Sequence, residues 1–130
     1  MGDDRYVAGM AVRRAVLGAE HVERATAAAS PFDAPFQRFI TEAAWGSVWT
    51  RAGLDRRTRS LVTLAILATR GCWEEFRLHV RAMVNTGATA AELDEVLRHV
   101  AASAGLPTAA RGRQVLREEE ARATVGSAGS

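Results

Sequence analysis

Three side chains that can carry chemistry lie along one edge of a predicted helix near the middle of the chain. At about 100° per residue, Cys72, Glu75 and His79 fall within about 60° of one another on a helix spanning about residues 72–85. A carboxyl group and an imidazole one turn apart, at the border of an apolar face, can act as an acid/base pair. Because the same spacing also occurs on solvated surface helices, the pattern by itself leaves a structural role open.

A second group of candidate residues precedes this helix. Trp45 and Trp49 are four residues apart on one helical face, so they either pack in a core or interface or form the wall of a ligand pocket. Arg51, Arg57 and Arg59 follow, in a segment with four arginines within nine residues. Since guanidinium groups bind carboxylates through paired hydrogen bonds, we expect some of them to face an anion or a subunit interface.

The elements that must position these residues are helices. Apolar periodicity and capping residues predict helices over about residues 6–17, 20–28, 34–50, 55–70, 72–85, 89–103 and 108–122. The segment 61–68 is apolar on nearly every side, and such a helix must be surrounded by protein. We therefore expect an all-α subunit of six to seven helices without strands, whose core is completed by another subunit.

Length and composition limit the domain organisation and the function classes. The 130 residues suit one domain, over 1–122, with a flexible tail over 123–130. All 17 basic residues are arginine, which excludes enzymes that need a lysine Schiff base or a Walker-type lysine. The single cysteine excludes an internal disulfide and a cysteine-rich zinc site.

Partners and location follow from the same composition. The chain shows no apolar run of membrane-spanning length and no signal peptide, so we expect a cytoplasmic protein with no membrane association. Nucleic-acid binding is disfavoured because the arginines alternate with acidic residues and no binding motif is present. The predicted partners are a small anionic molecule and further copies of the chain.

The sequence resembles the carboxymuconolactone decarboxylase family. The similarity covers most of residues 5–100, and the blocks WGxxWTRxGLDRRTRS (45–60) and EExxLHxRA (74–82) are specific to that family. It implies an alkylhydroperoxidase-D-like helical subunit, assembled as trimers or hexamers with sites at or near subunit contacts. It also implies a lyase without cofactor or metal that decarboxylates 4-carboxymuconolactone to the enol-lactone of 3-oxoadipate.

This chemistry assigns a role to each candidate residue. The departing carboxylate is conjugated to the lactone carbonyl, so the substrate delocalises its own electrons and needs only a counter-charge and a proton. His79 is the expected proton donor, or the hydrogen-bond donor to the lactone oxygen, with Glu75 orienting it or sharing its proton. The three arginines are the expected anion clamps, and the two tryptophans are the expected pocket walls.

The sequence also departs from the family pattern. Ser47 replaces a glutamate, Cys72 replaces a residue that is often polar or basic, and the late block at 103–113 has lost its Tyr, Cys, Asn and Phe. A peroxidase of the same fold needs a second cysteine where this chain has Glu75. Two alternatives therefore stay open: another cofactor-free acid/base reaction on a lactone, quinone or polyketide-like compound, or a non-catalytic oligomeric binding protein.

Overall fold

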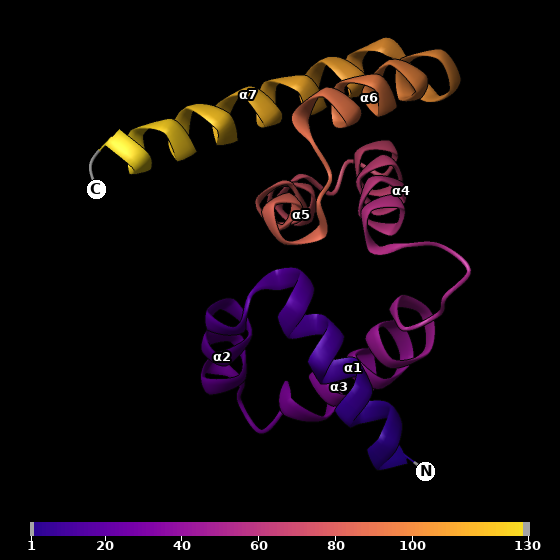
Figure 1. The fold of residues 1–130 in the computed structure, drawn as a ribbon, viewed down its shortest axis with the longest axis vertical. Helices are drawn as coiled ribbons and strands as arrows, with labels where there is room; N and C mark the ends of the chain where they lie inside the picture. Colours follow the sequence, from indigo (N-terminus) through magenta and orange to yellow (C-terminus); the bar gives the residue numbers. More distant parts are fainter. Residues whose placement is uncertain (1, 129–130) are drawn as a thin grey trace. The chain divides into compact units, whose positions relative to one another are not determined.

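Residues 2–128 of the computed structural model are described, with side chains from Asp4 to Gly126, and they contain helices and no strand (Figure 1). The elements run in the order α1 (Gly2–Leu17), α2 (Ala19–Ala28), α3 (Ala34–Ile40), the π-helix η1 (Thr41–Trp49), α4 (Arg56–Thr69), α5 (Trp73–Thr86), α6 (Ala90–Ala104) and α7 (Leu106–Ala128). The predicted all-α class is confirmed. The chain divides into two compact units, Met1–Arg56 and Arg57–Ser130.

In the N-terminal unit, α1 crosses η1 at a pair of glycines. A β-carbon on Gly9 would lie 2.3 Å from the carbonyl oxygen of Thr41, and one on Gly46 would lie 2.4 Å from the carbonyl oxygen of Arg5. Real β-carbons do not approach backbone this closely, so only glycine permits the crossing. Val12 and Val16 of α1 are buried beside it, and Val22 of α2 is fully buried.

The predicted helix over 34–50 changes its geometry part-way. It begins as α3, with Pro35 in the first turn, and continues from Thr41 to Trp49 as a π-helix. The hydroxyl of Ser47 donates a hydrogen bond of 2.9 Å to the carbonyl of Glu42, five residues earlier. π-Helical segments are rare and frequently occur at functional sites. This one carries both candidate tryptophans.

In the C-terminal unit, α4, α5, α6 and α7 share one hydrophobic core. It contains Leu64, Ala68, Phe76, Val80, Met83, Ala88, Leu93, Leu97, Val115 and Leu116. Helix α6 packs against the first part of α7, and α7 continues beyond it (Figure 1). This core holds the helix that carries His79.

Local signals explain where the helices of this unit end. Gly71 and Gly87 have φ angles of 70° and 86°, which favour glycine, and they close the turns after α4 and α5. Thr89 and Glu92 form the predicted capping box, with hydrogen bonds of 3.0 and 3.1 Å between each backbone N–H and the other side chain. The predicted boundaries of α4, α5 and α6 therefore agree with the structure within one residue.

α4 keeps apolar side chains at the surface of this chain, because Val62 and Ile66 are 44% and 54% exposed. These are side chains that another subunit is expected to cover, as the sequence predicts. The predicted end of the last helix at about residue 122 is too early, since α7 continues past Arg122 to Ala128. Alanine and arginine favour helix, so nothing in residues 121–124 stops it.

Candidate active site

The predicted site residues belong to both units. Trp45, Trp49 and Arg51 lie in the N-terminal unit, whereas the other four lie in the C-terminal unit. The structure brings the two tryptophans together: their ring centroids are 5.0 Å apart, with 30° between the ring planes. Trp45 is buried and Trp49 is partly exposed, so Trp49 is the ring of this pair that a ligand can contact.

His79 lies on the buried side of α5, among the core residues of the C-terminal unit. Its side chain is 9% exposed. Burial disfavours the charged imidazolium and lowers the pKa of His79 from 6.5 to about 4. At neutral pH the imidazole is therefore uncharged, and its N–H group can donate a hydrogen bond to a developing negative charge.

Glu75 and Cys72 lie earlier along α5 and differ in exposure. Glu75 is exposed, one turn before His79 in the helix. Cys72 is the N-terminal flanking residue of the helix and is partly buried, as expected. Along the predicted edge, an exposed carboxylate thus comes one turn before a buried imidazole. Protons from solvent can reach the carboxylate directly but not the imidazole.

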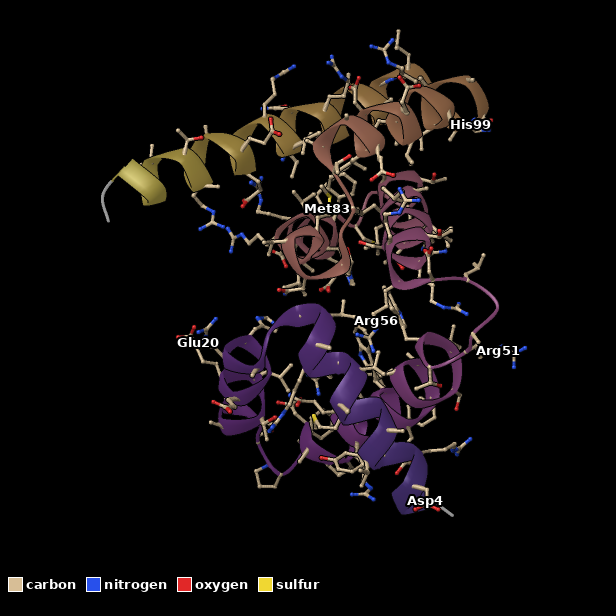
Figure 2. All side chains as sticks on the ribbon, viewed as in Figure 1. Asp4, Glu20, Arg51, Arg56, Met83 and His99 are labelled. Carbon is tan, nitrogen blue, oxygen red and sulfur yellow. The ribbon has the colours of Figure 1, made fainter. Side chains whose placement is uncertain are left out.

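The three candidate arginines have different surroundings. Arg51 is exposed on the loop after η1 (Figure 2), and Arg59 is partly buried on α4. Arg57 forms an ion pair with Glu92, the glutamate of the α6 capping box. Arg57, one of the arginines predicted to bind the substrate carboxylates, is therefore already paired with a carboxylate of its own unit.

Sequence reasoning missed a second charged cluster in the C-terminal unit. Glu119 is buried and accepts hydrogen bonds from Arg77, Arg81 and Arg122 at 2.8–2.9 Å. These guanidinium groups lower the pKa of Glu119 from 4.5 to about 2. Its position three residues after Leu116, on the buried stripe of α7, is the sequence signal that identifies it.

No group of three or more His, Cys, Asp or Glu side chains in the described part of the chain is arranged to hold a metal ion. No helix in that same part of the chain is long and apolar enough to cross a bilayer.

Comparison with known proteins places the chain in a family. The profile described as the Carboxymuconolactone decarboxylase family matches residues 34–118. The chain belongs to this family. The matched segment includes both tryptophans, all three candidate arginines, Glu75 and His79. Every candidate site residue of this carboxymuconolactone decarboxylase family member therefore lies within the matched segment.

Curated relatives are named as decarboxylases. A 4-carboxymuconolactone decarboxylase of Acinetobacter baylyi is 48% identical over 105 residues, which cover 81% of this chain and 78% of the relative. A nitrosuccinic acid decarboxylase of Metarhizium robertsii is 47% identical over 100 residues, covering 77% and 70%. A 4-carboxymuconolactone decarboxylase of Pseudomonas putida is 52% identical over 42 residues, covering 32% and 88%.

Proposed function

We propose that this carboxy-lyase decarboxylates 4-carboxymuconolactone, or a close analogue, to the enol-lactone of 3-oxoadipate without a cofactor. The observation that carries the proposal is the 48% identity to a 4-carboxymuconolactone decarboxylase over 81% of the chain. The buried imidazole of His79 supports it, because an N–H donor held in a site shielded from water stabilises a developing negative charge.

The proposed reaction has two steps. The bond between the ring carbon and the departing carboxylate breaks, CO₂ leaves, and the electron pair moves through the conjugated double bond onto the lactone carbonyl oxygen. The N–H of His79 donates a hydrogen bond to that oxygen as its charge develops. In its protonated form, Glu75 then delivers a proton to the ring carbon to give the enol-lactone, and the resulting carboxylate regains a proton from the solvent to which it is exposed.

Binding of the substrate falls to the remaining candidates. Arg51 and Arg59 hold the carboxylates, and Arg57 contributes only to the extent that a substrate carboxylate displaces Glu92. Trp45 and Trp49 form an apolar wall that lowers the local dielectric constant. The exposed apolar side chains Val62 and Ile66 of α4 support assembly into a homo-oligomer, which we propose as the active form.

A second candidate substrate is nitrosuccinic acid, favoured by the 47% identity to a nitrosuccinic acid decarboxylase. Its carboxylate leaves from a carbon next to a nitro group, which accepts the electron pair as the lactone carbonyl does. Both substrates also keep a second carboxylate for the arginines. The altered segment 103–113 and Ser47 are the positions that we expect to select between such acids.

Release of CO₂ from the two acids, measured in parallel with purified protein, tests the proposal. We expect turnover of 4-carboxymuconolactone, a loss of about 10²-fold or more in kcat for His79→Ala, and little change for the exposed control His99→Ala. Turnover of nitrosuccinate alone would replace the first substrate with the second. An absence of CO₂ from both acids would contradict the decarboxylase assignment.

A further inference from the structure

The N-terminal unit contains a pocket that the proposed reaction does not use. It has a volume of about 490 Å³ and lies between α1, α2 and the segment formed by α3 and η1. One side of it is polar, with Arg13, Arg38 and the phenol of Tyr6, and another side is apolar, with Met10 and the two prolines Pro31 and Pro35. No Asp or Glu is among its described lining residues.

The guanidinium of Arg13 is held in a fixed position by a buried threonine. Its Nη1 donates a hydrogen bond of 3.2 Å to the hydroxyl oxygen of Thr41. That hydroxyl donates its own hydrogen to the carbonyl of Gln37 at 2.8 Å, so only its lone pairs face Arg13. Thr41 is fully buried, and the orientation of the guanidinium is therefore set by the packing of the unit.

Among the described residues, no carboxylate compensates the positive charge of Arg13. The side chain is half-buried and forms no ion pair with any carboxylate of the described residues. Burial lowers the pKa of Arg13, and the nearby phenol of Tyr6 opposes this effect only in part. Arg38, by contrast, pairs with Glu42 at 3.1 Å and lies 4.2 Å over the ring of Tyr6.

The chemistry of the lining selects the class of ligand. A desolvated guanidinium with one hydrogen bond made has further N–H groups to offer, and it prefers a carboxylate or another planar anion. The volume lies in the range of small-molecule sites. An inorganic anion would leave the surface of Met10, Pro31 and Pro35 in contact with water, whereas an organic anion covers it.

We propose that this pocket binds a small organic carboxylate, with its carboxylate group on Arg13 and its apolar body against Met10, Pro31 and Pro35. The site uses none of the residues proposed for decarboxylation. It is thus a second ligand site, through which an organic acid stabilises the N-terminal unit.

Titration of the full-length protein with benzoate tests the proposal, and the two described methionines report on it. In protein labelled with ¹³C at the methionine methyl groups, the Met10 signal, assigned with Met10→Leu, should shift with a Kd of about 1 mM or tighter. Met83 lies on α5 in the C-terminal unit (Figure 2) and should not shift. A shift of Met83 alone, or no shift of Met10 up to about 10 mM benzoate, would overturn the proposal.

Charge recognition is tested with variants and a neutral probe. Arg13→Gln should weaken benzoate binding about tenfold or more, whereas Arg14→Gln, an exposed neighbour on α1 that does not line the pocket, should leave it unchanged. Benzamide should bind at least about tenfold more weakly than benzoate to the wild-type protein, a comparison that needs no variant to fold. Equal affinity for the two probes, or for wild type and a folded Arg13→Gln protein, would refute the site.

Discussion

Gly9 and Gly46 bring α1 and η1 into backbone contact, because a β-carbon on Gly9 would lie 2.8 Å from the amide nitrogen of Gly46. The contact is with main-chain atoms, which cannot rotate out of the way as a side chain can. The crossing also fixes the relation between Thr41 in η1 and Arg13 in α1 that defines the polar side of the pocket. The geometry of the N-terminal unit thus depends on the absence of a β-carbon at both Gly9 and Gly46.

Gly9→Ala should therefore destabilise the protein by about 2 kcal/mol or more in denaturant unfolding, as expected when a well-packed contact is overfilled. Gly53→Ala is the matched control, because nothing lies within 4 Å of a β-carbon at that position. It should change the free energy of unfolding by less than about 0.5 kcal/mol. Similar effects of the two substitutions would show that the close crossing does not limit stability.

The buried His79 should make stability depend on pH in a predictable direction. Its pKa is about 4 in the folded protein and about 6.5 when exposed, so the unfolded chain binds the proton more tightly. The fold loses stability as pH falls from about 6.5 towards 4, by about 2 kcal/mol between pH 7 and pH 5 for this group. The free energy of unfolding of His79→Gln should therefore fall by about 2 kcal/mol less than that of the wild type between pH 7 and pH 5. A pH dependence equal to that of the wild type would contradict the neutral, buried state.

Glu119 has a pH dependence of the same sign at lower pH, because its pKa in the folded protein also lies below its ordinary value. The stabilisation by its three arginines is complete above about pH 4.5 and is lost as pH falls towards 2. At pH 7, Glu119→Gln should cost about 2 kcal/mol, a moderate value because the arginine partners are 30–57% exposed. Glu120→Gln, at an exposed neighbouring position, should cost less than about 0.5 kcal/mol. Equal costs would show that the cluster is only a surface feature.

The capping box of α6 gives a local stability test. Thr89→Ala removes the acceptor for the backbone N–H of Glu92 and should cost about 1 kcal/mol. Thr69→Ala is its control, since that exposed hydroxyl only donates to the carbonyl of Ala65 within α4. Circular dichroism during urea unfolding measures both. A cost for Thr89→Ala no greater than that of Thr69→Ala would show that the cap does not stabilise α6.

The helices of the C-terminal unit could be predicted from the sequence because their signals are local. Gly71 and Gly87 mark turns, Thr89 and Glu92 mark a cap, and Phe76, Val80 and Met83 repeat at helical spacing. The change to π geometry at Thr41 was not predictable in this way, since no turn residue, cap or break in the apolar spacing marks it in the sequence.

The candidate site was less accessible to sequence reasoning. The burial of His79 follows from its position beside Val80 on the apolar stripe, but the pKa depends on how completely the core encloses it. The pairing of Arg57 with Glu92 joins residues 35 positions apart in the sequence, which periodicity cannot detect. Arg13 could have been noticed, because at about 100° per residue it lies within about 60° of buried Gly9 and Val16.

The π-helix has a consequence for how this protein can vary. A π turn holds more residues than an α turn, so deleting one residue between Thr41 and Trp49 would let the segment relax to an α-helix instead of breaking it. A deletion between Trp45 and Trp49 would change their spacing from four residues to three and so change how the two rings pack against each other. Insertions and deletions here, and not only substitutions, thus offer evolution a way to reshape the aromatic surface while the surrounding helices stay in register.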